Sequence, residues 1–198
     1  MTLLVKICGI TDERAADAAV ACGADAVGFV FAPSVRRLTP SRARKIAARV
    51  PSHVRRVAVM LHPGADEWHD VQQGFRPDVL QTDREDYAAL DVDDGIERWP
   101  VYREGLMTAD ADWPEVFVYE GPKSGAGETV DWKTAAGIAK KGRMILAGGL
   151  AVDNVADAIE TVHPYGVDVS SAVESQPGVK DPDLVAAFIS AARGAREV

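Results

Sequence analysis

The run Leu3-Leu4-Val5-Lys6-Ile7-Cys8-Gly9-Ile10 sets a pattern that the rest of the chain repeats. Its apolar part is typical of a short buried strand, and it stops at the turn Cys8-Gly9. A helical pattern follows directly, with Thr11-Asp12 as the predicted N-cap and Gly23 just beyond the C-terminal end. The start of the chain therefore predicts one strand–turn–helix unit.

The same unit recurs to the end of the chain. Short apolar, β-branched runs predict strands at Leu3–Ile7, Ala26–Phe31, Arg56–Met60, Val79–Gln81, Val101–Arg103, Val116–Tyr119, Met144–Ala147 and Val167–Ser170. Helical patterns lie between them, at Asp12–Cys22, Pro40–Val50, Ala65–Gln73, Arg84–Leu90, Asp131–Lys140, Asn154–Val162 and Pro182–Arg193. Strands that alternate with helices pair in parallel through right-handed crossovers. The alternation favours a (β/α)₈ TIM barrel over an open doubly wound sheet.

The chain is short for such a barrel. It has 198 residues, against about 250 in a typical member of the fold. We therefore expect short loops and a fifth helix that is reduced or missing, because Glu104–Pro114 is typical of a loop or a single turn. Since no linker, fixed-period repeat or low-complexity tract interrupts the pattern, residues 1–198 are predicted to form a single domain.

Composition narrows the class of function. The net charge is −8, from 22 basic and 30 acidic residues, which disfavours binding to nucleic acid or to an anionic membrane. Two cysteines, Cys8 and Cys22, do not suggest a disulfide framework. The chain shows neither a signal-peptide pattern nor an apolar run near the roughly 20 residues of a membrane span. We expect a cytoplasmic protein that acts on a small molecule.

In a barrel of this kind, the residues that follow the strands meet on one face. Cys8 ends the first strand and is well placed for chemistry there, although a buried cysteine is more often a small apolar residue. Lys6 lies in the same apolar strand, where an unpaired ammonium is costly, so we expect it to pair with Asp168. Other strand ends bring polar side chains to this face, among them Gln81, Asp83, Arg103 and Glu120.

Two neighbouring loops predict an anion site. Gly148-Gly149 lies between a strand and a helix, where backbone N–H groups and the helix N-terminus favour a phosphate. Ser170-Ser171 supplies the adjoining loop, and barrels commonly bind phosphate in these two loops. The alternative is a glycine turn required only for tight packing. Arg36, after the second strand, can pair with a substrate carboxylate, although alone it is typical of a solvated loop. No histidine pair has metal-ligand spacing, so no metal site is predicted.

Taken together, these segments resemble the phosphoribosylanthranilate isomerase family of tryptophan biosynthesis. The matching stretches cover essentially the whole chain: Val5–Thr11, Gly23–Phe31, Ser34–Arg36, Asp131-Trp132, Leu146–Leu150, Val167–Ser171 and Pro177–Asp181. The resemblance implies an Amadori rearrangement of N-(5′-phosphoribosyl)anthranilate to 1-(o-carboxyphenylamino)-1-deoxyribulose 5-phosphate. It implies no cofactor, because the iminium nitrogen of the substrate is the electron sink, and a monomer or homodimer.

The resemblance also implies roles for individual residues. Cys8 would be the general base, acting as a thiolate. Either the site lowers the pKa of the thiol from about 8.5, with Lys6 as the nearest cation in the sequence, or a minor thiolate fraction suffices. Arg36 would hold the anthranilate carboxylate. Further substrate contacts are expected from Lys6, Gln81, Asp83 and Asp168, and phosphate contacts from Gly148, Gly149, Ser170 and Ser171.

Three departures from the family pattern concern the acid and the phosphate loop. The family ends its sixth strand with an Asp as general acid, whereas this chain has Glu120. We rank Glu120 first as the acid, Asp83 second and Tyr119 third. Asp83 is a candidate because Leu80-Gln81-Thr82-Asp83 stands where the family usually has Gln-Leu-His-Gly. Ala172 replaces a Gly after the serine pair, which adds a Cβ where a positive φ is expected. A non-catalytic phosphosugar-binding relative and an isomerase of altered phosphosugar specificity therefore remain alternatives.

Overall fold

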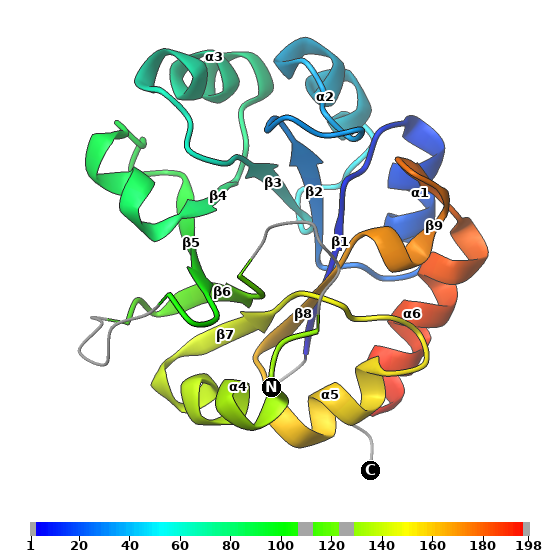
Figure 1. Ribbon diagram of the computed structural model, residues 1–198. Helices are drawn as coiled ribbons and strands as arrows, with labels where there is room; N and C mark the ends of the chain where they lie inside the picture. The colour runs from blue at the N-terminus through cyan, green and yellow to red at the C-terminus, as the bar shows by residue number, and fades with distance from the viewer. Residues whose placement is uncertain (1–2, 107–112, 123–128, 196–198) are drawn as a thin grey trace.

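Eight parallel strands close into a barrel, in chain order from β1 to β8, in the computed structural model (Figure 1). The structure describes residues 3–106, 113–122 and 129–195. The strands are β1 Leu4–Cys8, β2 Ala26–Val30, β3 Arg55–Val59, β4 Val79–Asp83, β5 Glu97–Arg103, β6 Val116–Glu120, β7 Arg143–Leu146 and β8 Gly166–Val169. The predicted (β/α)₈ TIM barrel is confirmed.

Helices surround the barrel and follow the predicted pattern at most positions. They are α1 Glu13–Ala21, α2 Pro40–Ala47, α3 Ala65–Phe75, α4 Trp132–Ile138, α5 Val155–Val162 and α6 Pro182–Gly194. The caps behave as expected: the side chain of Asp12 accepts a hydrogen bond from the backbone of Ala15. Gly23, just past α1, has φ +88°, a conformation that glycine adopts without strain.

The connection after β4 differs from the prediction. The segment expected to be an α-helix forms a 3₁₀-helix instead, η1 Arg84–Ala89, and none of its residues is buried. Side chains fix it locally, because the Tyr87 hydroxyl donates to the carbonyl of Leu80 and Asp86 accepts a hydrogen bond from Thr82. A segment this short that buries no apolar stripe gains little from α-helical packing. Most of the predicted fifth-helix segment, residues 107–112, lies outside the described residues.

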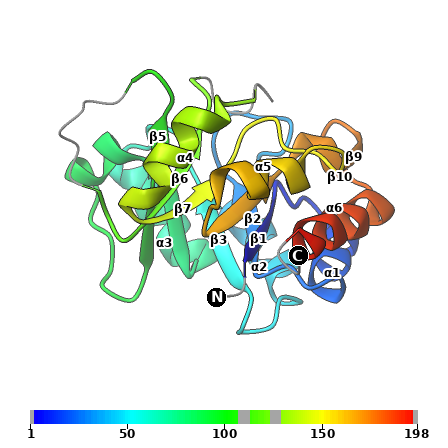
Figure 2. The same ribbon diagram turned by 90° about the horizontal axis from the view of Figure 1, so that it is seen from below.

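A small hairpin after β8 was not predicted. Following the 3₁₀-helix η3 Ser171–Val173, the strands β9 Glu174–Gln176 and β10 Val179–Lys180 pair antiparallel. They are too short to show an alternating pattern in the sequence. Figure 2 shows the hairpin at the end of the barrel opposite the chain's N-terminus. A further 3₁₀-helix, η2 Ala139–Lys141, extends α4.

Strand alternation divides the core into two parts. Along β1, Val5 and Ile7 point outward and pack in the layer between strands and helices. Leu4 points inward, to an apolar plug inside the barrel that also contains Ala26, Val57, Val79, Trp99, Val101, Val118, Ile145 and Ala147. The same alternation turns Lys6 and Cys8 inward, beyond this plug. Polar side chains therefore gather at the carboxyl ends of the strands. Among the described residues, the helices are too short or too polar to span a bilayer.

Candidate active site

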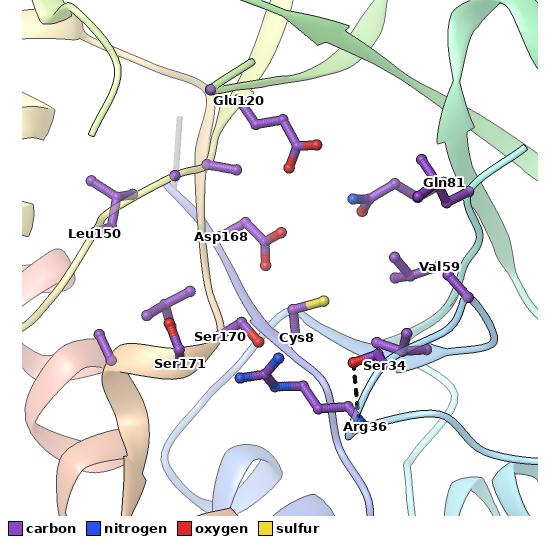
Figure 3. Close-up of a pocket in the computed structure, with 18 of the residues that line it drawn as sticks. Cys8, Ser34, Arg36, Val59, Gln81, Glu120, Leu150, Asp168, Ser170 and Ser171 are labelled. Carbon is purple, nitrogen blue, oxygen red and sulfur yellow. Dashed lines mark hydrogen bonds between the residues drawn. The ribbon is translucent and has the colours of Figure 1, made fainter. Parts of the chain in front are cut away.

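A cavity of about 490 Å³ opens at the carboxyl ends of the strands. Figure 3 shows the Cys8 sulfur, the Glu120 carboxylate and the Gln81 amide pointing into it from different sides. Most of the predicted site residues line it: Cys8, Arg36, Gln81, Glu120, Gly148, Gly149, Asp168, Ser170 and Ser171. Two do not, because Lys6 is fully buried behind the wall and Asp83 lies to the side.

The predicted pairing of Lys6 is confirmed. Its Nζ lies 2.7 Å from Oδ2 of Asp168, and the two residues are register partners on the adjacent strands β1 and β8. Burial alone would lower the pKa of Lys6, but Asp168 and Cys8 raise it above its usual value, so the ammonium stays charged. The other carboxylate oxygen, Oδ1, is buried and accepts no hydrogen bond from the described residues. Because Asp168 lines the cavity, this oxygen is a candidate acceptor for a hydrogen bond from a ligand.

Cys8 is a neutral thiol in the free protein at pH 7. Burial is the largest effect on this side chain and raises its pKa, while the cations Lys6 and Lys180 oppose the rise without cancelling it. Of the two expectations for the thiol, the structure therefore favours a minor thiolate fraction over a lowered pKa. The two buried ammonium groups keep that fraction larger than burial alone would allow.

Arg36 is held by a partner that the sequence did not reveal. Its Nε and Nη2 donate to the two carboxylate oxygens of Glu174, at 2.7 and 2.8 Å. Glu174 also accepts a hydrogen bond from Lys180 at 2.7 Å and one from the backbone of Gly178 at 3.1 Å. Although burial raises the pKa of Glu174, these donors hold it down to about 2. Lys180 in turn donates to the carbonyl of Ser170 at 2.9 Å. The hairpin thus links the arginine to the Ser170-Ser171 loop.

Gly9 is the local reason why Arg36 fits at the cavity. The glycine has φ +80°, and a Cβ built there would lie 2.5 Å from Cδ of Arg36. Any larger residue at this turn would be strained and would displace the arginine. Neither Glu174 nor Lys180 is among the predicted site residues, because the apolar periodicity of the sequence does not locate a counter-charge for Arg36.

The two predicted phosphate loops adjoin each other at the cavity. Gly148 and Gly149 have φ +92° and +62°, and a Cβ on Gly149 would lie 2.4 Å from the Thr129 hydroxyl. Asn154 braces this loop by donating to the carbonyl of Gly149. Position 172 does not require a glycine, because Ala172 does not have a positive φ. The described non-glycine residues with positive φ are His62, Arg76 and His163. The expected strain in the Ser170-Ser171 loop is therefore absent.

The three candidate acids occupy different environments. Glu120 faces the cavity, and its Oε1 lies 2.5 Å from Nη1 of Arg103. Asp83 is paired with the same arginine at 2.6 Å and is not a cavity-lining residue. Tyr119 is fully buried, its pKa is raised by burial, and its hydroxyl donates to Glu104. Of the three, Glu120 alone can reach a ligand in the cavity without rearrangement.

Gln81 adds a second buried acceptor at the cavity wall. It is 4% exposed, and its Oε1 accepts no hydrogen bond from the described residues. A buried carbonyl oxygen left without a donor is costly, so a donor on a bound ligand would be favoured there. In the described ranges, no group of at least three His, Cys, Asp or Glu side chains is arranged to hold a metal ion.

Comparison with known proteins agrees with this geometry. The sequence model of a family described as N-(5′-phosphoribosyl)anthranilate (PRA) isomerase matches residues 5–191. The N-(5′-phosphoribosyl)anthranilate isomerase of Geotalea uraniireducens is 40% identical, over 96% of this chain and 98% of its own.

Solved structures give the same result. The phosphoribosyl anthranilate isomerase of Thermus thermophilus superposes with a TM-score of 0.85 at 30% identity, covering 98% of this chain and 100% of its own. Another isomerase, solved in complex with reduced 1-(o-carboxyphenylamino)-1-deoxyribulose 5-phosphate, has a TM-score of 0.78 at 30% identity, with the same coverage of both chains. The chain described here belongs to the phosphoribosylanthranilate isomerase family.

Proposed function

We propose that the cavity catalyses the Amadori rearrangement of N-(5′-phosphoribosyl)anthranilate to 1-(o-carboxyphenylamino)-1-deoxyribulose 5-phosphate. One observation carries the assignment of roles: Cys8 and Glu120 face the same cavity, between an arginine and two anion-binding loops. This arrangement provides a base and an acid on one bound phosphosugar. The reaction is a step of tryptophan biosynthesis and proceeds without a cofactor.

The substrate's two anionic ends have separate sites. The phosphate binds the backbone and hydroxyl donors of Gly148-Gly149 and Ser170-Ser171. The anthranilate carboxylate lies against the Nη1 side of Arg36, since Nε and Nη2 already bind Glu174. Between these ends, Oε1 of Gln81 and Oδ1 of Asp168 accept hydrogen bonds from sugar hydroxyls or from the anilino N–H.

Catalysis then needs two proton transfers. Glu120, protonated, gives its proton to the ring oxygen as the C1′–O bond breaks, and the furanose opens to an iminium ion. The Cys8 thiolate removes the C2′ proton, and the electron pair of that C–H bond moves toward the iminium nitrogen to give an enolamine. Tautomerisation yields the aminoketose. Each proton transfer of this kind accelerates the reaction by about 10²- to 10⁴-fold. Because Cys8 is a neutral thiol at pH 7, the base is its minor thiolate form.

Turnover is the direct test. We expect the protein to consume freshly made phosphoribosylanthranilate, followed as loss of anthranilate-type fluorescence, and Glu120→Gln to lower kcat by about 10²-fold or more. Asp83→Asn should retain far more activity, because Asp83 is not at the cavity wall. Binding of a product analogue without turnover would identify a non-catalytic relative, and turnover of a different phosphosugar alone would identify altered specificity. Full activity in Glu120→Gln would remove that residue from the acid role.

Glu174→Gln is predicted to weaken substrate binding. The neutral amide no longer balances the charges of Arg36 and Lys180, so the arginine loses the bidentate contact that orients it. We expect KM to rise by about 10-fold, roughly one charge-assisted hydrogen bond, with a smaller change in kcat. Steady-state kinetics measures both constants. Glu67→Gln, at an exposed ion pair with Arg37, is the control and should change neither. A loss confined to kcat would contradict the prediction.

We also infer a reducing, cytoplasmic location. Cys8 and Cys22 are both free thiols. Oxidation of Cys8 would remove the proposed base, so the proposed chemistry requires a compartment that keeps thiols reduced.

A further inference from the structure

Arg103, at the end of β5, joins two carboxylates that come from the strands on either side. Its Nη1 lies 2.5 Å from Oε1 of Glu120 on β6, and the two residues are register partners. Its Nη2 and Nε donate to the two oxygens of Asp83 on β4, at 2.6 and 3.2 Å. The arginine side chain is only 11% exposed. Glu120 and Asp83 therefore share one partly buried guanidinium.

Other charged groups surround this triad. On the β4 side, His62 lies 3.4 Å from Asp83 and 3.0 Å from Asp86, and its pKa is raised, chiefly by the hydrogen bond to Asp86. On the cavity side, Asp168 and its partner Lys6 lie deeper in the barrel. Glu104, next to Arg103 in the chain, accepts hydrogen bonds from Tyr119 and from the backbone of Asp131. The Glu120 carboxylate itself pairs with Arg103.

We propose that Arg103 is a positioning residue that holds the Glu120 carboxyl at the cavity and controls how readily it takes up a proton, with Asp83 as the residue that moderates this control. The proposal rests on the proposed function of Glu120 as the acid. It assigns Asp83 a role other than that of a second acid, since its carboxylate binds the arginine and does not line the cavity.

Arg103 and Asp83 are expected to affect the protonation of Glu120 in opposite directions. A cation within hydrogen-bond distance favours the ionised carboxylate and so disfavours the protonated form that an acid needs. Asp83 offsets part of that cation's charge by pairing with it. Removal of the arginine charge therefore makes protonation of Glu120 easier, whereas removal of the Asp83 charge leaves the full guanidinium to Glu120 and makes protonation harder.

The test compares pH profiles of kcat/KM in Arg103→Met and Asp83→Asn. Glu120→Gln, at high enzyme concentration, first identifies the limb of the profile that depends on Glu120. We expect Arg103→Met to move that limb to higher pH by about one unit or more, and Asp83→Asn to move it to lower pH. Arg103→Lys should keep the limb near its wild-type position but lower kcat, because a lysine cannot hold both carboxylates in a fork.

Arg98→Met is the matched control. Arg98 lies on the same strand at the opposite end of the barrel and is exposed, so its loss should move nothing. Where a variant is too slow to assay, a ¹³C-carboxyl NMR titration of Glu120 in the folded protein measures the same shifts directly, and circular dichroism confirms folding.

Distinct outcomes separate the two proposals. An unchanged profile and full activity in Glu120→Gln would overturn the acid assignment, and the role of Arg103 with it. A limb that is lost in Glu120→Gln but stays in place in both Arg103→Met and Asp83→Asn would overturn only the role of Arg103. Shifts of the same sign in the two variants would also overturn it, because a merely structural arginine would produce no opposed pair.

Discussion

Replacement of Cys8 by alanine is expected to lower kcat by about 10³- to 10⁴-fold, the largest effect on activity of any substitution proposed for this chain. Glu120 can still open the sugar ring in such a variant, but no group is left at the end of β1 to remove the C2′ proton. The substrate should still bind, because Arg36 and the two anion loops are untouched. Fluorescence assays of turnover and calorimetric titration with a product analogue measure the two effects separately.

The matched control uses the second cysteine. Cys22 is the C-cap of α1 and does not line the cavity, so Cys22→Ala should leave turnover unchanged. In that background, the ultraviolet absorbance of the Cys8 thiolate should appear at higher pH than in an exposed cysteine, because burial raises its pKa. Lys180→Met should move it higher still. Near-normal turnover in Cys8→Ala would remove the base assignment.

The sequence predicts those features that depend on a local pattern, or on a buried charge that is costly to leave unpaired. Alternation of strands and helices predicted the barrel, and with it the face on which Cys8, Glu120 and the glycine pair meet. The pairing of Lys6 followed from the cost of a buried ammonium, and the geometry agrees at 2.7 Å.

The contacts that the sequence did not reveal join residues on different elements of the fold. Glu174 binds Arg36 across 138 positions, and the hairpin that presents it is too short to leave a periodic pattern. The sequence predicts Arg103 as a strand end, but its partners depend on which side chains of β4 and β6 point the same way at one level of the barrel. The level of a residue in a closed barrel follows from the strand register. The pattern of apolar residues predicts which face of the sheet a side chain points to, but not which residue of the neighbouring strand lies beside it.

Lys6→Met is expected to produce the largest loss of stability. Lys6 is fully buried, so its removal leaves the carboxylate of Asp168 inside the barrel without its cation. Removal of one partner of a buried ion pair typically costs about 3–5 kcal/mol. Urea unfolding followed by tryptophan fluorescence measures this loss, and Asp17→Asn, at an exposed pair with Arg49, is the comparison that should change stability far less.

The double variant separates charge from function. In Lys6→Met with Asp168→Asn, no charge is left uncompensated at this position, so most of the stability should return. Activity should not return, because Lys6 no longer favours the Cys8 thiolate and the amide at position 168 replaces one of the acceptors at the cavity wall. Stability and kcat would thus change independently across the same pair of residues. If the double variant were as unstable as Lys6→Met alone, the cost would lie in lost packing around the lysine stem, and if it recovered activity, the pair would serve the fold and not the reaction.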